Sequence, residues 1–460
     1  MGDRDYRSLS FWHDSVPGSL EPRAPLAGDV DVDVAIVGAG YTGLWTAYYL
    51  KSLQPDVRIA VVEAEIAGFG ASGRNGGWCV GHMAGMENHL ADPERRDGAI
   101  ALQRAAFESV DEVGEACRRE EIDCHYAKGG NLTLALAEAH RTQLRLDLER
   151  WRELGFGESD VRWLSPDECR GVAGVPGNLG GLFFAHCAAL HPARLARGLA
   201  DVLERRGVAI FERSPATAIE PRCVVTAGGR VRADLIVRAT EAYTKSLAGQ
   251  RRTLLPVHSM MIATEPLPET AWKEIGLSNR ETFSDPRRMV TYGQRTADDR
   301  IAFGTRGAYF YGSTIHDRFA PDHPAFRGVQ RVLESFFPSL RGCRITHRWG
   351  GALGIPRDWR PSVGVDRAAG LAWAGGYVGE GVAASNLAAR TLADLVLERE
   401  TDLTRLPLVG PPFPAWEPEP LRWLGVTGVR LLGESLDGAE LRGAATPRLR
   451  RALYGAFVRK

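Results

Sequence analysis

Three glycines, Gly38, Gly40 and Gly43, begin directly after an apolar segment at residues 34–37. Each glycine meets one requirement of dinucleotide binding. The first permits a tight turn, the second lets the backbone approach a pyrophosphate, and the third lets a helix pack closely on a strand. The pattern predicts a buried strand at residues 34–37 and a helix over 41–53 whose N-terminus points at the phosphates.

An acidic residue, Glu63, completes this unit. It ends a second apolar segment at residues 58–62, twenty residues after Gly43, where a carboxylate accepts hydrogen bonds from ribose hydroxyls. A glycine-rich loop follows at residues 68–77, and such a loop indicates close approach of the backbone to a flat or charged ligand. An ordinary glycine-rich turn would match the glycines, but not the strand, helix, second strand and acid in register. The sequence therefore predicts a dinucleotide site.

Length and composition narrow the range of ligands. The chain has 460 residues, which is more than one hydrophobic core organises, so we expect two domains. Its 57 basic and 57 acidic residues give zero net charge, which provides no general attraction to nucleic acid or to an anionic membrane. A small molecule is the expected ligand.

The cysteines and the apolar segments point to the cytoplasm. Seven cysteines are scattered without a Cys-x-x-Cys pair, which argues against a disulfide framework and against a zinc site, so no metal is expected. A reducing compartment fits this usage. No stretch of eighteen apolar residues occurs and the N-terminus lacks an apolar signal core, so we expect neither secretion nor a membrane span.

The rest of the chain alternates between strand-like and helical patterns. Residues before Asp31 include Phe11 and Trp12 and are expected to lie across the surface of the first domain. Residues 93–154 carry apolar residues at three- and four-residue spacing, typical of a helical insertion. Proline-rich residues 407–420 indicate a linker to a C-terminal tail. Strands are expected at residues 129–136, 180–184, 208–211, 224–226, 234–240, 257–264, 289–292, 301–305 and 372–376, and helices at 192–206, 326–336 and 382–398.

Several segments together resemble the FAD-dependent oxidoreductases of the D-amino-acid oxidase and glycine oxidase superfamily and, within it, most resemble the γ-glutamylputrescine oxidase group. They are residues 36–50, 70–77, 190–192, 238–244, 255–256, 263–266 and 375–382. The resemblance implies an α/β fold in which a discontinuous, Rossmann-like FAD-binding domain of the GR2 type is interleaved with an α+β substrate domain, whose antiparallel sheet covers the flavin. The implied order is a leader at residues 1–30, FAD-binding segments at 31–90, 191–250 and 346–400, substrate-domain segments at 91–190 and 251–345, and a linker and tail at 401–460.

The family motifs also imply where FAD lies. The glycine turn would hold the pyrophosphate, Glu63 the ribose, and the loop from Ser72 to Gly77 the pyrophosphate and the isoalloxazine edge. Small residues on two middle strands would flank the adenine. The helix that starts near Val382 would face the flavin pyrimidine, where free N–H groups stabilise the negative charge of a reduced flavin. The implied cofactor residues are Gly38, Ala39, Gly40, Tyr41, Thr42, Gly43, Glu63, Ala64, Ser72, Asn75, Gly76, Gly77, Thr217, Ala218, Ala239, Thr240, Gly379, Glu380, Gly381 and Val382.

The sequence departs from these relatives in two places. Members with covalent flavin carry a late cysteine or a histidine after the first βαβ unit, whereas Trp349 and Arg74 stand in these regions here and Cys343 lies earlier. The FAD is therefore expected to be non-covalent. Relatives that use oxygen place a lysine near residues 300–306, where this chain has only Arg300 and Arg306 as cations. Oxygen and another electron acceptor both stay open, with oxygen slightly favoured.

The flavin performs the hard chemical step in such enzymes, so the protein has to orient the substrate and exclude water. Arg306 can pair with a substrate carboxylate, and Glu380, which stands where many relatives carry histidine, can attract a cationic amine. The aromatic candidates also fit simple packing. The residues expected to face the flavin are Trp78, His82, Tyr292, Arg306, Trp349 and Glu380, of which Tyr292, Arg306, Trp349 and Glu380 are the catalytic candidates.

These features predict FAD-dependent oxidation of a CH–NH bond in an amine or amino acid. Hydride transfer to flavin N5 would give an imine that hydrolyses in water. Three alternatives stay open: a dehydrogenase that uses an acceptor other than oxygen, oxidation of a hydroxy acid, and a flavin-binding subunit of a hetero-oligomer. In the last case, the residues beyond Pro407 would serve as an interaction arm.

Overall fold

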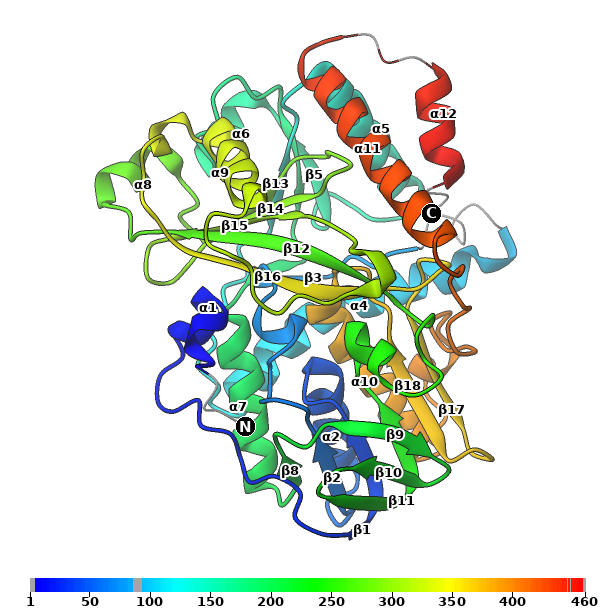
Figure 1. Ribbon diagram of the computed structural model, residues 1–460. Helices are drawn as coiled ribbons and strands as arrows, with labels where there is room; N and C mark the ends of the chain where they lie inside the picture. Colours follow the sequence, from blue (N-terminus) through cyan, green and yellow to red (C-terminus); the bar gives the residue numbers. More distant parts are fainter. Residues whose placement is uncertain (1–4, 86–92, 445, 447, 458–460) are drawn as a thin grey trace.

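The glycine turn joins β1 (Val30–Val37) to α2 (Tyr41–Leu53) in the first of two large sheets (Figure 1). The computed structural model describes residues 5–85, 93–444, 446 and 448–457. β1 pairs in parallel with β2 (Ile59–Val62) on one side and with β11 (Gly229–Arg238) on the other. The βαβ unit predicted from the glycine spacing is confirmed, with its helix beginning directly after Gly40.

The first sheet draws its strands from separate stretches of the chain. Five strands run parallel in it, with buried apolar side chains, as is usual for parallel sheets. The discontinuous, Rossmann-like arrangement is confirmed, although the boundary expected at residue 90 lies outside the described residues. The strand order is β17 (Ser362–Asp366), β18 (Leu371–Gly375), β11, β1, β2 and β8 (Ala209–Phe211), with β10 (Cys223–Thr226) pairing with β11 and β9 (Ala216–Glu220) pairing with β10.

The second sheet belongs to the substrate domain and is antiparallel except where β4 pairs with β13. Its β12 (Leu255–Thr264) and β16 (Ile345–Ile355) form the longest pairing. A two-stranded ribbon of β3 (Trp78–Val80) and β7 (Cys187–Ala189) lies outside both large sheets. The order in the second sheet is β16, β12, β15 (Ile301–Arg306), β14 (Thr291–Arg295), β13 (Thr282–Ser284), β4 (Asn131–Leu134), β6 (Gly181–Phe184) and β5 (Val161–Leu164).

Helices cover both sheets (Figure 1). α2, α4 (Pro93–Arg119), α7 (Pro192–Arg205) and α10 (Gly381–Val396) contribute to the core beside the first sheet. In the substrate domain, α9 (Pro324–Phe336) packs on the second sheet around a cluster of buried phenylalanines. The expected helical insertion consists of α4 and α5 (Glu138–Glu153), with β4 between them. Among the described residues these domains also contain three shorter helices, α1 (Phe11–Asp14), α6 (Pro166–Val172) and α8 (Glu269–Ile275).

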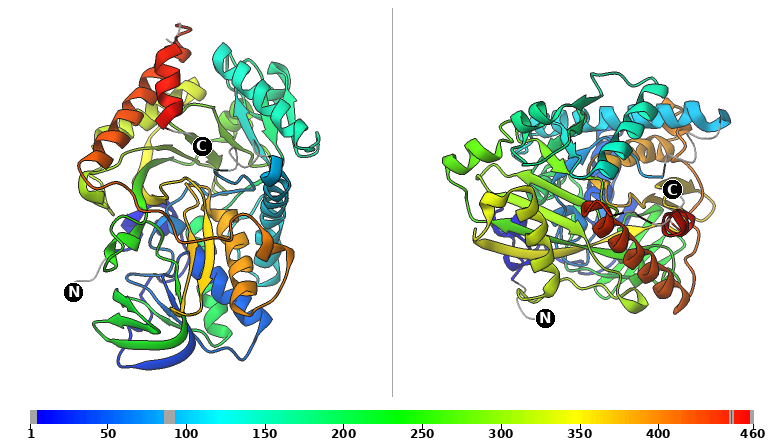
Figure 2. Two further views of the ribbon diagram at one scale, coloured as in Figure 1. Left: turned by 90° about the vertical axis from the view of Figure 1, so that its right-hand side faces the viewer. Right: turned by 90° about the horizontal axis from the view of Figure 1, so that it is seen from above.

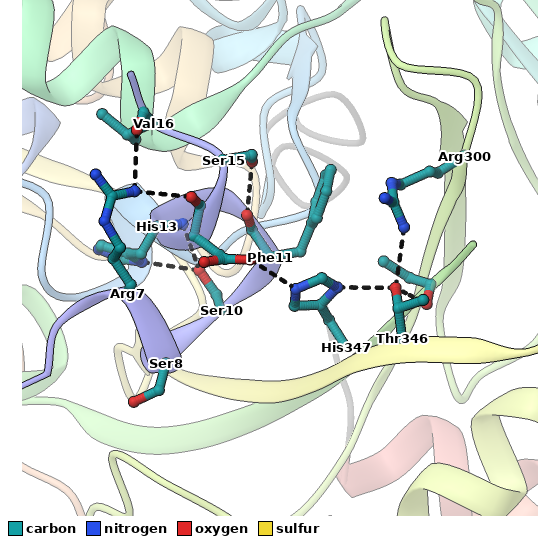
Figure 3. A network of polar contacts seen from close by, with 12 residues as sticks. Arg7, Ser8, Ser10, Phe11, His13, Ser15, Val16, Arg300, Thr346 and His347 are labelled. Carbon is teal, nitrogen blue, oxygen red and sulfur yellow. Dashed lines mark hydrogen bonds and ion pairs between the residues drawn. The ribbon is translucent and has the colours of Figure 1, made fainter. Parts of the chain in front are cut away.

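The leader was expected on the surface of the first domain, but its aromatic pair is buried. Phe11 and Trp12 are 3% and 1% exposed in α1 and pack among residues of both domains. Large aromatic side chains gain most when they are removed from water, which favours insertion over surface contact. Figure 3 shows the polar contacts around this segment, in which His347 Nε2 lies 3.2 Å from an oxygen of Asp14.

The tail forms a helical hairpin on the substrate domain (Figure 2). Its two helices are α11 (Leu421–Leu441) and α12 (Arg448–Phe457). Asp437 accepts hydrogen bonds from the backbone N–H groups of Arg288 and Met289 at 3.1 and 2.9 Å. Glu440 forms two further bonds to the Arg288 guanidinium, at 2.7 and 2.9 Å. α11 therefore holds the loop between β13 and β14.

Candidate active site

One cavity of about 1050 Å³ runs from the glycine turn of the first sheet to the substrate sheet. Its walls include the glycine turn, the glycine-rich loop, the start of α10 and side chains of β14 and β15. A single continuous space therefore connects the predicted cofactor residues with the predicted catalytic ones. Most of the predicted residues line it, and those that do not are described below.

The three glycines of the turn have two different roles. A Cβ atom on Gly38 would lie 2.5 Å from the carbonyl oxygen of Ala239, and one on Gly43 would lie 2.0 Å from that of Gly38. Both positions are thus closed by backbone. A Cβ on Gly40 would meet only the hydroxyl of Ser72, at 3.0 Å, and Gly40 lines the cavity. Gly40 is the position where the backbone is open to a ligand.

The residues that follow Gly40 connect the glycine turn to the neighbouring loop. Tyr41 and Thr42 line the cavity at the N-terminus of α2, whereas Ala39 and Gly43 do not. The backbone N–H of Tyr41 donates to Ser72 Oγ at 2.8 Å, which joins the turn to the glycine-rich loop. The positive end of the α2 dipole therefore faces the cavity.

Glu63 directly follows β2 at the cavity wall, beside Ala64. Its carboxylate accepts the backbone N–H groups of Ala39 and Glu65 at 2.7 and 2.9 Å. Burial raises the pKa of Glu63 to about 7, although the two backbone hydrogen bonds act to lower it. The acid thus titrates close to neutral pH when no ligand is bound.

Residues 70–77, which are predicted to run along the flavin and which we call the flavin loop, are closed by their own asparagine. Asn75 Nδ2 donates to the carbonyl oxygens of Ala71 and Ser72 at 3.1 Å, and Asn75 Oδ1 accepts the N–H of Gly77 at 2.7 Å. Ser72, Asn75 and Gly76 line the cavity. Gly77 has a left-handed backbone (φ 70°) and lies against protein on its other side, because a Cβ there would be 2.0 Å from Nε2 of Gln294.

The four residues predicted at the adenine end do not all line the cavity. Ala239 and Thr240 line the cavity as expected, but Thr217 and Ala218 do not, and Pro215 and Ala216 line it instead. Thr217 donates to the carbonyl oxygen of Val225 on β10 and is exposed. β9 leaves the cavity wall after its first residue, so the middle of the strand lies outside the site.

The start of α10 forms the opposite end of the cavity. Gly379, Glu380, Gly381 and Val382 all line it. The preceding Val378 holds a left-handed conformation (φ 56°), which is rare for a β-branched residue and is typical of a strained functional site. First-turn N–H groups of α10 lack helical acceptors, so they are available to an anionic or electron-rich ligand.

Tyr292 and Arg306 project from neighbouring strands into the same cavity. β14 and β15 pair Tyr292 with Gly304, which places Tyr292 and Arg306 on one face of the sheet. Tyr292 lies against the flavin loop, since a Cβ on Gly76 would be 2.5 Å from its ring. Burial raises the pKa of Tyr292 to about 12, so its hydroxyl stays protonated at neutral pH.

Arg306 is held by a backbone carbonyl. Its Nη2 donates to the Val378 oxygen at 2.8 Å. Burial lowers the pKa of Arg306, while the negative charge of Glu380 acts to raise it. An arginine stays charged under these conditions, so the site contains a fixed cation.

Glu380 and His82 form a pair at the same end of the cavity. His82 Nδ1 lies 3.0 and 3.1 Å from the two oxygens of Glu380. The side chains are 39% and 30% exposed, so solvent and substrate can reach them. Trp78 and His82, the two remaining candidates, also line the cavity.

Trp349, predicted as a catalytic candidate, does not line the cavity. It is 2% exposed behind the flavin loop, where its Nε1 donates to the Arg74 carbonyl oxygen at 2.9 Å. Arg300, considered as an oxygen-activating cation, is also outside the cavity and binds Asp298, the Thr264 carbonyl oxygen and Thr346. Both side chains are used in contacts within the protein, which strand spacing alone does not reveal.

Glu241 is a site residue that the sequence analysis did not single out. It lines the cavity, accepts the N–H of Gly354 at 2.5 Å, and has a pKa raised by burial to about 7. It lies within residues 238–244, one of the segments that carry the family resemblance, and no other feature of the sequence pointed to a site residue there. A further part of the cavity wall, which we call the distal wall, was not predicted from the sequence either. It consists of apolar side chains from α5, β6 and the segment after α5, namely Leu144, Trp151, Leu154, Phe156, Leu182 and Phe184.

These residues fit FAD. Gly40 opens toward the cavity, the N-termini of α2 and α10 face it, and a carboxylate stands at the end of β2. This combination supplies donors for phosphate and an acceptor for ribose hydroxyls. All seven cysteines are unpaired and none of them lines the cavity, so non-covalent binding stays our prediction.

The described residues bear on two other expectations. Within them, no three His, Cys, Asp or Glu side chains come close enough together to hold a metal ion. No helix in this part of the chain is long and apolar enough to cross a bilayer.

Comparison with known proteins defines the class. Residues 33–395 match the model of the D-amino-acid oxidase family, described as FAD-dependent oxidoreductases. The chain belongs to this family, and it is an FAD-dependent oxidoreductase.

Individual relatives agree with this class, and solved structures agree with the fold. The chain is 31% identical over 414 residues to γ-glutamylputrescine oxidoreductase of Escherichia coli, covering 88% of this chain and 93% of that protein. It is 30% identical over 383 residues to a probable oxidoreductase of Haemophilus influenzae, covering 81% and 84%. Glycine oxidase of Geobacillus kaustophilus superposes with a TM-score of 0.69 at 21% identity, covering 83% of this chain and 98% of that one. L-Proline dehydrogenase of P. horikoshii gives 0.67 at 17% identity, covering 83% and 96%.

Proposed function

We propose that this protein oxidises a CH–NH bond of an amine or amino acid. When bound, FAD supplies the hydride acceptor. The protein orients the substrate and excludes water, and the imine product then hydrolyses. The relatives support this substrate class, because one is named for a γ-glutamylated amine and the solved structures include enzymes of glycine and L-proline.

The observation that carries the proposal is the pair of opposite charges at one end of the cavity. Arg306 offers a guanidinium to a carboxylate, and Glu380 offers a carboxylate to an ammonium group. Tyr292 lies between the sheet and the flavin loop and can accept or donate one further hydrogen bond. A substrate that carries nitrogen and an acid or amide group matches these partners.

The electron acceptor is the second part of the proposal. We place oxygen slightly ahead of another acceptor, because Arg306 keeps a positive charge within the cavity. Arg300 lies outside the cavity, where it binds Asp298, the Thr264 carbonyl oxygen and Thr346, so we assign it no part in this step. We also place the enzyme in the cytoplasm, which the unpaired cysteines support.

Product analysis tests the proposal. The holoenzyme is incubated with amines, amino acids and hydroxy acids, in air and with a dye acceptor under argon, and aldehyde or keto product, ammonia and peroxide are measured. We expect turnover of a nitrogen substrate, with peroxide in air. Glu380→Gln should raise KM for that substrate about tenfold with a smaller change in kcat.

The competing functions give other outcomes. Turnover of hydroxy acids alone would identify a hydroxy-acid oxidoreductase, and turnover with the dye but without peroxide would identify a dehydrogenase. An enzyme inert to all substrates until a partner protein is added would support the subunit alternative. The apolar residues of α11 that face solvent are the surface to examine in that case, namely Leu421, Leu424 and Leu431.

A further inference from the structure

The flavin loop is fixed from outside the cavity by four buried side chains. Its successive carbonyl oxygens, from Gly73 to Gly76, each accept one side-chain hydrogen bond. The donors are Ser10 Oγ to Gly73 at 3.4 Å, Trp349 Nε1 to Arg74 at 2.9 Å, Trp12 Nε1 to Asn75 at 2.8 Å, and Gln294 Nε2 to Gly76 at 2.6 Å. We call Ser10, Trp12, Gln294 and Trp349 the carbonyl clamp.

The clamp residues come from three segments that are far apart in the chain. Ser10 and Trp12 belong to the leader, Gln294 to β14 and Trp349 to β16. All four are at most 3% exposed, and none of them lines the cavity. The two indoles also meet edge to face, with centroids 6.3 Å apart. The clamp therefore forms only when leader, FAD domain and substrate sheet come together.

The clamp determines which way the loop peptides point. In a trans peptide, the carbonyl of one residue and the N–H of the next point in opposite directions. Trp12 takes the Asn75 oxygen on the buried side, so the N–H of Gly76 points away from Trp12. Gly76 lines the cavity, and among the described residues no acceptor takes its N–H. A backbone donor on the cavity wall that has no protein acceptor is available to a ligand acceptor.

We propose that the carbonyl clamp positions the flavin loop so that the Gly76 N–H is presented to the flavin. Ser10, Trp12, Gln294 and Trp349 are positioning residues, because they bind the loop and do not line the cavity. A fixed N–H beside the flavin stabilises the negative charge that develops on reduction. The leader thus contributes to the redox site. This inference does not depend on which substrate the enzyme oxidises.

Two indole-to-phenyl substitutions test the clamp. Trp12→Phe and Trp349→Phe each keep an aromatic ring but remove the N–H that binds a loop carbonyl. We expect FAD release from the diluted holoenzyme, followed by flavin fluorescence, to become about tenfold faster in each, the change that one lost hydrogen bond produces. The midpoint potential of the bound flavin should become more negative.

The control is Trp272→Phe. Trp272 is a buried tryptophan of the substrate domain whose Nε1 has no hydrogen-bond partner in the described structure, so this variant removes an indole without freeing a carbonyl. Its FAD release rate and midpoint potential should equal those of the wild type. In the double variant Trp12→Phe with Trp349→Phe, the two effects should not be additive, because both act on one loop.

The clamp is refuted if either indole variant folds and keeps the wild-type release rate and midpoint potential. Equal losses in Trp272→Phe would refute it as well, because general destabilisation would then explain the effect. If Trp12→Phe does not fold, two other variants provide the same test. Trp349→Phe changes the clamp at β16, and Ser10→Ala changes it in the leader. A faster release without any change in potential would also contradict the proposal, since the Gly76 N–H would then have no electrostatic role.

Discussion

Glu63 accepts the backbone N–H of Ala39 at 2.7 Å. Glu63, which directly follows β2, thus fixes the glycine turn. Its other carboxylate oxygen accepts the backbone N–H of Glu65. Burial raises the pKa of this carboxyl to about 7. We therefore predict that cofactor binding is coupled to the protonation of Glu63.

FAD affinity should increase with pH through about 7. Ribose hydroxyls donate to the ionised carboxylate, so FAD binds the form that dominates above the pKa. Below about pH 7 the affinity should fall, approaching tenfold per pH unit, and above pH 8 it should be constant. Titrating apoprotein with FAD between about pH 6 and 8.5 measures this. Glu63→Gln should bind weakly with little pH dependence, and a wild-type affinity that does not change with pH would show that Glu63 does not titrate on binding.

Gly40 and Gly43 should respond differently to substitution. Gly40→Val should leave a folded protein without FAD, because the added side chain enters the cavity and meets only Ser72. Gly43→Ala should lower the free energy of unfolding by several kcal/mol, since its Cβ would lie 2.0 Å from the Gly38 carbonyl oxygen. Flavin absorbance and denaturant unfolding separate the two effects. Gly40→Val protein that retains FAD would count against the assignment of the turn.

Replacing Arg306 should separate the two half-reactions if oxygen is the acceptor. Arg306→Gln removes a partly buried cation at the cavity wall, so reoxidation by oxygen should slow more than reduction by substrate. Stopped-flow measurement of both steps checks this, with Arg300→Gln as the matched control outside the cavity. Equal slowing of both steps would assign Arg306 to substrate binding instead.

The tail should stabilise the substrate domain through Asp437. Asp437→Ala would leave the backbone N–H groups of Arg288 and Met289 without their buried acceptor and would remove one of the acceptors of the Arg288 guanidinium, which keeps Glu440. This loss costs about 3 kcal/mol. Glu434→Ala removes an exposed partner of Arg430 on the same helix and should cost about 0.5 kcal/mol or less. Urea unfolding of both variants provides the comparison. A similar small effect for both would mean that α11 is only loosely attached.

The sequence was most informative where one local rule determines the structure. Gly38, Gly40 and Gly43 predicted both the turn and the helix that starts at Tyr41, because steric limits on the backbone act over a few residues. Thr217, which was predicted at the adenine end, does not line the cavity, whereas Pro215 and Ala216 do. A strand pattern identifies a segment but not the residue at which it leaves a cavity wall.

Contacts between distant segments could not be predicted from one sequence. Trp349 is an aromatic residue of the kind that lines many ligand sites, but its indole N–H donates to the Arg74 carbonyl oxygen behind the flavin loop. Trp12 lies in a segment that lacks strong periodicity, and its burial depends on how two domains meet. The apolar distal wall depends in the same way on where α5 packs.

Anaerobic addition of substrates to the holoenzyme tests the central claim most directly. The loss of flavin absorbance near 450 nm is followed after mixing with amines, amino acids and hydroxy acids, without any electron acceptor. We predict that at least one amine or amino acid bleaches the flavin, and that deuterium on its α-carbon slows the bleaching. A flavin that hydroxy acids alone reduce, or that no substrate reduces although dithionite does, would contradict the account.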